Sequence, residues 1–113
     1  MRLHTKVWDF KVHVAEDNGM GLLGRPPLRQ YEALLMIFPY EGFWKIHSLG
    51  LNYAIDVLWL NKDNQVVDRV VLPPETPAVG PDLPALKVIE MHAGMSKLAG
   101  IKVGDYLTLS SPN

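Results

Sequence analysis

Residues 45–60, KIHSLGLNYAIDVLWL, carry a strand pattern on both sides of one glycine. Aromatic and β-branched residues dominate the segments before and after Gly50, and these residue types favour strands. Glycine adopts the backbone angles of tight turns at little cost, so it is common where a chain reverses between two strands. The stretch therefore predicts a β-hairpin centred near Gly50 and a fold built mainly from strands.

Further strands are predicted on both sides of this hairpin. Residues 7–14, VWDFKVHV, alternate apolar and polar side chains at the period of a half-buried strand. Residues 31–38, YEALLMIF, fit either a buried strand or a helix, but their shortness and the following Pro39 and Gly42 favour a strand. The remaining candidates are the strands QVVDRVVL (65–72), ALKVIEM (85–91) and YLTLS (106–110), with GMSKLAG (94–100) as one brief helix.

Turn-forming residues separate these segments. The five prolines between Pro73 and Pro84 remove backbone donors and predict an exposed loop without regular structure. Residues 22–30, LLGRPPLRQ, predict a surface connection with one helical turn, because two prolines exclude a central strand. Glycine, asparagine and aspartate predict further turns at EDNGMG (16–21), NKDN (61–64) and KVGD (102–105).

A meander of about six short strands with one short helix is typical of an all-β fold, either a small β-rich barrel or a sandwich-like meander. An α+β fold is the alternative, and it would require residues 22–35 to form a helix. The length of 113 residues predicts a single domain over residues 1–113.

The composition is that of an ordinary globular domain, with 48% hydrophobic and 20% charged residues. The formal net charge of -1 gives no broad attraction for phosphates, so neither nucleic acid nor a membrane is an expected partner. With no cysteine, the chain has no disulfide and no thiolate metal site. The sequence shows no signal peptide and no apolar run of about 18 residues, so the expected location is the cytoplasm or an assembled particle.

Four segments of the chain resemble a known family in their order and spacing. They are GLLGRPPL (21–28), IHSLGLNYAIDVLWLNKDNQVV (46–67), VIEMHAG (88–94) and GIKVGDYLTL (100–109). Together they are similar to the bacterial and archaeal domain of unknown function 192 family, over about residues 21–109. The resemblance implies a compact β-rich barrel, and it implies no established biochemical activity.

The resemblance also selects individual positions, which are Gly24, Arg25, His47, Gly50, Asp56, Glu90, Gly94, Gly104 and Asp105. The chain departs from the family pattern at Ser48, Ala54 and His92, where threonine, proline and proline are usual. Structural roles in turns are predicted for Gly50, Gly94, Gly100, Gly104 and Asp105.

His47 and Asp56 are the candidate catalytic residues if the protein is an enzyme. If the hairpin turns near residues 51 and 52, the two residues lie opposite each other, with Cβ atoms about 4.5–5.5 Å apart. A carboxylate at that distance orients an imidazole as a general base, but acyl transfer also needs a nucleophile and an oxyanion hole. Ser48 would point to the opposite face of the strand. A buried structural hydrogen bond is the commoner use of such a pair and is the favoured interpretation.

No metal and no other cofactor is expected. The four histidines lack H-x-H or H-x-x-x-H spacing, and a zinc site needs three or four converging ligands. Arg25 is a candidate for binding an anion, with a salt bridge to Asp105 or Glu90 as the structural alternative. Trp44, and Pro77 in the proline-rich loop, are candidates for contact with a ligand or a partner.

Two classes of function fit these observations. The favoured class is a non-enzymatic binding or structural module that docks on a protein partner or self-associates, for example as an accessory or decoration protein of a virion. The alternative is a small hydrolase, or a carbohydrate- or small-ligand-binding domain, that uses His47, Asp56 and Arg25. A cleft that contains all three side chains would favour the alternative, and a buried pair without a cavity would favour the first class.

Overall fold

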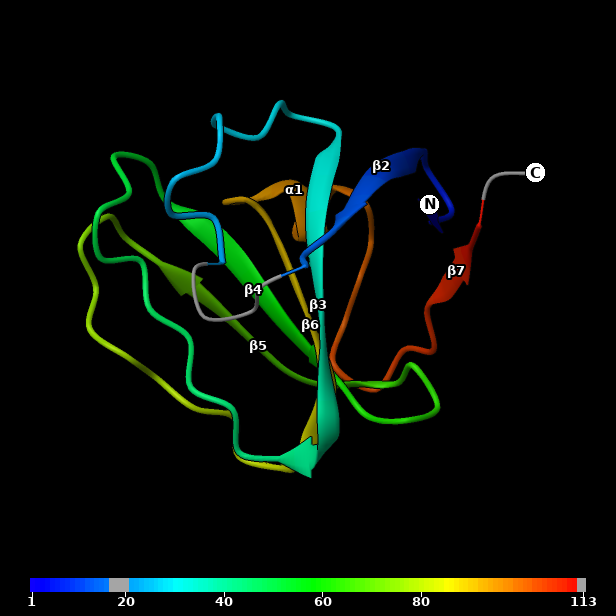
Figure 1. Ribbon diagram of the computed structural model, residues 1–113. Coiled ribbons are helices and arrows are strands. Elements are labelled where there is room, and N and C mark those ends of the chain that lie inside the picture. Colours follow the sequence, from blue (N-terminus) through cyan, green and yellow to red (C-terminus); the bar gives the residue numbers. More distant parts are fainter. Residues whose placement is uncertain (17–20, 112–113) are drawn as a thin grey trace.

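The computed structural model describes residues 1–16 and 21–111, which form one sheet of seven strands and one short helix (Figure 1). The strand order is β5-β4-β6-β3-β2-β1-β7, and every neighbouring pair is antiparallel except β2 and β3. The elements are β1 (Arg2–His4), β2 (Asp9–Val14), β3 (Glu32–Gly42), β4 (Ile55–Leu60), β5 (Val66–Leu72), β6 (Ala85–His92), α1 (Met95–Leu98) and β7 (Thr108–Ser110).

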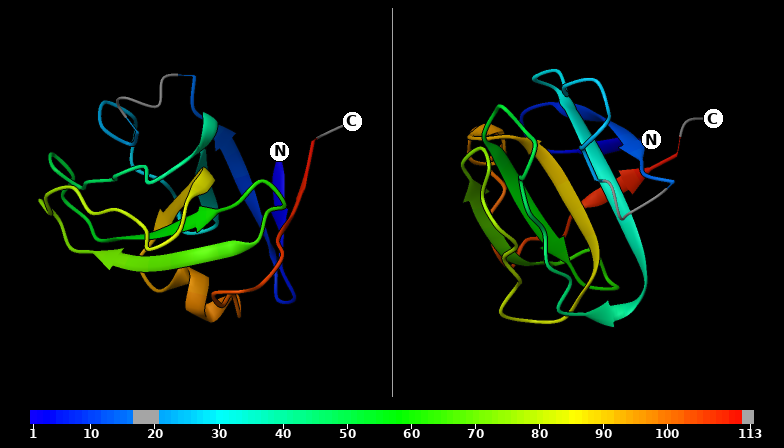
Figure 2. Two further views of the ribbon diagram at one scale, coloured as in Figure 1. Left: turned by 90° about the horizontal axis from the view of Figure 1, so that it is seen from below. Right: turned by 60° about the vertical axis from the view of Figure 1, so that its left-hand side comes forward.

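The sheet curls along its length into a half-barrel (Figure 2). This confirms the predicted all-β fold with one short helix, and residues 22–35 do not form the helix that an α+β fold would need. The sequence of β3 fits both a strand and a helix because four consecutive residues, from Ala33 to Met36, are buried. A strand covered on both faces shows a continuous apolar run instead of an alternating one.

Alternate residues of the central strands enter two separate apolar clusters, one on each face of the sheet. The face that packs against α1, called the helix face, gathers Leu35, Leu58, Ile89 and Met91 with Met95. The opposite face, called the loop face, gathers Leu34, Met36, Val57 and Val88 with Leu22, Ile46 and Leu51 from the connecting loops.

The predicted hairpin around Gly50 is wrong. Residues 43–54 form a loop, and their one ladder contact with other described residues is an isolated bridge between Ile46 and Val79. Strand β4 pairs with β5 on one side and β6 on the other, so both of its edges are occupied. The loop has the sequence pattern of a half-buried strand because Ile46 and Ser48 are buried while Lys45, His47 and Leu49 are exposed.

The proline-rich segment 73–84 forms no regular strand, as predicted. It runs beside the loop 43–54, where Ile46 and Val79 exchange two backbone hydrogen bonds of 2.8 Å. The Ser48 hydroxyl donates to the carbonyl of Pro73 at 2.6 Å and accepts the N–H of Thr76 at 2.8 Å. These two loops are therefore fastened to each other, and their side chains cover the loop face together with Leu22.

Most of the other connections agree with the sequence. Residues 61–64 turn between β4 and β5, and Gly100 follows α1 with a φ of 76°. Residues 22–30 contain a turn closed by the N–H of Arg25 on the carbonyl of Leu22, without a helix. The predicted turn 16–21 lies mostly outside the described residues. Strand β1 was not predicted from the sequence. It has three residues, of which only Leu3 is buried, and so short a strand shows no alternating pattern.

Candidate functional site

Asp56 lies on the helix face and holds α1 against the sheet. The residue is 1% exposed, and its backbone is paired with Met91 of β6 in the sheet. One carboxylate oxygen accepts the N–H of Gly94 at 3.1 Å, and the other accepts the N–H and the hydroxyl of Ser96 at 3.0 and 2.6 Å. Because all of these donors belong to the start of α1, Asp56 has a structural role.

His47 is not the partner of Asp56. The ladder places Val71 and Met91 beside Asp56, whereas His47 lies in the loop 43–54 that covers the loop face. The proposed cross-strand register is therefore wrong, and so is the expected hydrogen bond between the two side chains. The reason is that the segment before Gly50 crosses over the sheet instead of pairing with β4.

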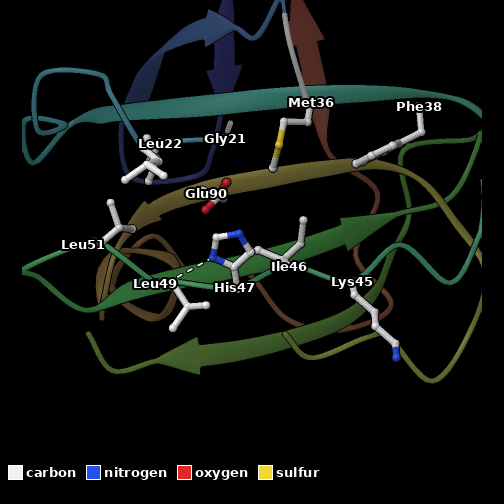
Figure 3. Close-up of a pocket in the computed structure, with 11 residues that line it drawn as sticks. Gly21, Leu22, Met36, Phe38, Lys45, Ile46, His47, Leu49, Leu51 and Glu90 are labelled. Carbon is white, nitrogen blue, oxygen red and sulfur yellow. Dashed lines mark hydrogen bonds between the residues drawn. The ribbon is translucent and has the colours of Figure 1, made fainter. Parts of the chain in front are cut away.

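A cavity of about 260 Å³ lies on the loop face, between the sheet and its covering loops. Its wall is mostly apolar, and two titratable side chains, Glu90 and His47, project into it (Figure 3). The lining residues are Gly21, Leu22, Leu23, Met36, Phe38, Lys45, Ile46, His47, Leu49, Leu51 and Glu90.

Glu90 is the unusual group in this cavity. It is 2% exposed, and in the ladder it lies between the apolar residues Leu34 of β3 and Val57 of β4. Among the described residues, no hydrogen bond or ion pair reaches its carboxyl group. Burial raises the pKa of Glu90 to about 7, because the charged form loses its hydration without gaining a partner. At neutral pH the group therefore exists in both protonation states.

His47 lies at the mouth of the cavity on the exposed loop. Its Nδ1 accepts the backbone N–H of Leu49 at 3.1 Å. In the neutral ring the proton must then be on Nε2, because a nitrogen that accepts a hydrogen bond cannot carry one. Neutral His47 is consequently a hydrogen-bond donor through Nε2.

Two glycines shape the approach to this cavity. Gly50 has a φ of 85°, and a Cβ added there would lie 2.5 Å from Cδ1 of Leu23. Its N–H donates to Oε1 of Glu75 at 3.1 Å, which ties the loop 43–54 to the proline-rich loop. A Cβ at Gly21 would lie 3.4 Å from Oε1 of Glu90, so the chain passes close to the buried carboxyl group.

The other candidate residues are not among those that line the cavity. Arg25 is exposed and forms no salt bridge with any described residue, so the expected pairing with Asp105 or Glu90 is absent there. Pro77 is exposed on its loop. Trp44 stacks on Phe38 of the cavity wall, with ring centroids 4.5 Å apart and planes 13° apart.

The predicted turn residues take the following conformations. Gly94, Gly100 and Gly104 have φ values of 89°, 76° and 97°. The Asp105 carboxylate accepts the N–H of Lys102 at 2.8 Å within its turn. Within residues 1–16 and 21–111, no group of three or more metal-ligating side chains comes together.

Side chains of β1, β2 and β7 form a second polar cluster at the edge of the sheet. His4 Nδ1 lies 3.0 Å from Oδ1 of Asp9, and His4 Nε2 lies 2.6 Å from the hydroxyl of Ser110. His4 and Asp9 are 40% and 39% exposed. The cluster joins the three strands, and it has the order of groups found in a Ser-His-Asp triad.

Sequence reasoning did not place Glu90 in a site. From the sequence, Glu90 is named only as a position that the family resemblance selects and as one alternative salt-bridge partner of Arg25. The available signal is an acidic residue between Ile89 and Met91, in a strand that is buried on both faces. A lone acid in such a strand points into one of two apolar clusters, and it then needs either a partner or a function.

Residues 4–109 match the sequence pattern of the DUF192 family, described as uncharacterized ACR. The chain belongs to this family. The match begins earlier than the segments that suggested it, and it includes the whole of β2. The family description assigns no activity.

Two proteins from archaea are similar to most of this chain. A UPF0127 protein from Pyrococcus furiosus is 36% identical over 90 residues, which is 78% of this chain and 74% of the relative. A UPF0127 protein from Pyrococcus abyssi is 33% identical over 103 residues, covering 87% and 85%. Neither protein's name states an activity.

Two crystal structures share the fold. A Sinorhizobium meliloti protein, described as a proposed transcription regulator, has a TM-score of 0.83 and 23% identity, covering 95% of this chain and 89% of that one. A protein of unknown function from Novosphingobium aromaticivorans has a TM-score of 0.81 and 18% identity, covering 96% and 82%. At these identities the likeness establishes the fold alone.

No helix among the described residues is long and apolar enough to cross a membrane.

Substitution Asp56→Asn tests the structural role of Asp56. The amide would place an NH2 group against the N–H and hydroxyl of Ser96, or against the N–H of Gly94, and donors facing donors lose their hydrogen bonds. We expect the free energy of unfolding to fall by about 2–3 kcal/mol in a urea titration. Asp63→Asn, on the exposed turn 61–64, is the control and should change it by less than about 0.5 kcal/mol. Equal midpoints for Asp56→Asn and wild type would contradict this role.

Proposed function

We propose that the protein is a binding module for a small, mostly apolar molecule, which occupies the loop-face cavity and interacts with Glu90. The observation that carries this proposal is a buried carboxyl group that lines a cavity and has no partner among the described residues. An apolar side chain at position 90 would make the fold more stable, since a buried unpaired acid is destabilising. A destabilising group inside a cavity is typical of a ligand site.

The size and wall of the cavity limit the ligand. A cavity of about 150 Å³ holds benzene, and drug-sized ligands use about 300–1,000 Å³. The volume of about 260 Å³ therefore suits one ring with a short substituent. Leu23 and Leu49 remain 39% and 44% exposed at the rim, where they would contact the bound molecule.

The proposal belongs to one of the two function classes that the sequence allowed, but it assigns the ligand contacts to different residues. The small-ligand alternative is favoured, with Glu90 and His47 in place of His47, Asp56 and Arg25. Docking on a protein partner, self-association and a role in a virion stay predictions, as does the expected lack of nucleic-acid binding. The regulatory role named for the Sinorhizobium meliloti protein concerns that protein, and the net charge of -1 gives no support for DNA binding by this chain.

Amide chemical shifts of the 15N-labelled protein test the proposal, with toluene and benzyl alcohol as neutral one-ring probes. We expect saturable shifts around Met36, His47 and Glu90. Met36→Trp should abolish them by filling the cavity, whereas Leu98→Trp, at a 64% exposed position on α1, should leave them unchanged. Absence of saturable shifts at the cavity with both probes in the wild-type protein would contradict the proposal.

A second candidate function, hydrolysis of activated esters, is supported by the polar cluster of His4, Asp9 and Ser110. In this role Asp9 accepts the Nδ1 proton of His4, and Nε2 takes the Ser110 proton as Oγ bonds to the acyl carbon. The leaving group departs with that proton, and water then releases the acid. Arg2 pairs with Ser110 across the ladder and is exposed, so its guanidinium can stabilise the oxyanion.

Acylation by p-nitrophenyl acetate tests this second function. We expect an acetyl group on Ser110 in the mass spectrum of the digested wild-type protein. The adduct should be lost in Ser110→Ala and in His4→Gln, and kept in the neighbouring control Ser111→Ala. A wild-type protein without an adduct on Ser110, or an equal adduct in His4→Gln, would rule out the hydrolase function and leave the cluster as a link between strands.

A further inference from the structure

The floor of the loop-face cavity holds Glu90, an acid that forms no ion pair with any described residue. The titratable groups around Glu90 are Lys45, His47 and Tyr53 from the loop 43–54, and His92 on its own strand. Lys45 is exposed at the mouth and forms no ion pair with any described residue. His92 is already hydrogen-bonded to the carbonyl of Leu28 and stacks on Tyr53. None of these groups forms a hydrogen bond or an ion pair with Glu90.

We propose that the cavity selects a protonated amine, which pairs with the carboxylate of Glu90 while its apolar body contacts the leucine and methionine side chains. This inference rests on the proposed function, since it names the chemical class of the bound molecule. A cation inside the cavity gives the buried carboxylate the partner that the described chain lacks. A ligand carboxylate would instead place two acids together, and one of them would have to stay protonated.

The wall supplies a second feature suited to a cation. Phe38 lines the cavity and is backed by Trp44, which stacks on it at 4.5 Å. The face of an aromatic ring attracts a cation that lies within about 6 Å. Aliphatic residues such as Leu22, Met36 and Leu51 form the remaining wall and accommodate an uncharged ring.

Binding of an amine must then depend on pH. The amine pairs with the ionised form of Glu90, and burial puts the pKa of this group at about 7. The apparent affinity is proportional to the ionised fraction, which increases about tenfold between roughly pH 6 and pH 8. An alkylamine remains protonated over this interval, so the change comes from the protein.

The experiment compares three probes of nearly equal size, which are benzylamine, benzyl alcohol and benzoate. Affinities are measured from amide shifts at about pH 6 and pH 8. We expect benzylamine to bind most tightly at pH 8 and about tenfold more weakly at pH 6. Glu90→Gln should remove both the preference for the amine and its pH dependence while it keeps benzyl alcohol binding. Glu16→Gln, at an exposed acid, is the matched control and should behave as wild type.

The outcomes separate this inference from the proposed function. If benzyl alcohol or benzoate binds more tightly than benzylamine at pH 8, the cavity binds ligands but the amine class is wrong. An amine affinity that does not change with pH, or that Glu90→Gln leaves unaltered, also overturns the pairing with Glu90. If none of the three probes binds, both the inference and the proposed function fail.

Discussion

Strands β4 and β6 are covered on both faces, and their two-residue period decides the environment of every polar side chain they carry. In β6, Met91 points to the helix face and Glu90 to the loop face. In β4, Asp56 points to the helix face between apolar neighbours. No solvated face is available to either acid, so each must find a partner within the fold or remain unpaired.

The two acids meet this constraint in opposite ways. Asp56 accepts three hydrogen bonds from the start of α1, and this fixes the helix on the sheet. Glu90 has no such donor among the described residues, and burial raises its pKa to about 7. One carboxyl group therefore stabilises the fold, while the other is retained at a cost in stability next to a cavity. That contrast is the physical basis for placing function on the loop face.

The sequence predicted the strands and the fold class because alternating and apolar runs report burial directly. It failed at residues 43–49, where a loop with buried Ile46 and Ser48 has the same pattern as a half-buried strand. That single error produced the proposed His47–Asp56 pair, because spacing along the chain cannot show which face of the sheet a segment covers. His47 was found as a candidate, but its cavity and its neighbour Glu90 depend on contacts between segments far apart in sequence.

The central claim is that Glu90 is buried and has no partner among residues 1–16 and 21–111, and the pH dependence of stability tests this most directly. A group whose pKa is higher in the folded than in the unfolded state stabilises below its unfolded value of 4.5, and that stabilisation is lost as the pH rises through about 7. Glu90→Gln lacks this titration. From about pH 5 to pH 8, wild type should therefore lose about 2–3 kcal/mol of unfolding free energy relative to Glu90→Gln. A difference that stays constant within about 0.5 kcal/mol would contradict the claim and show that the carboxyl group is solvated or paired in the folded protein.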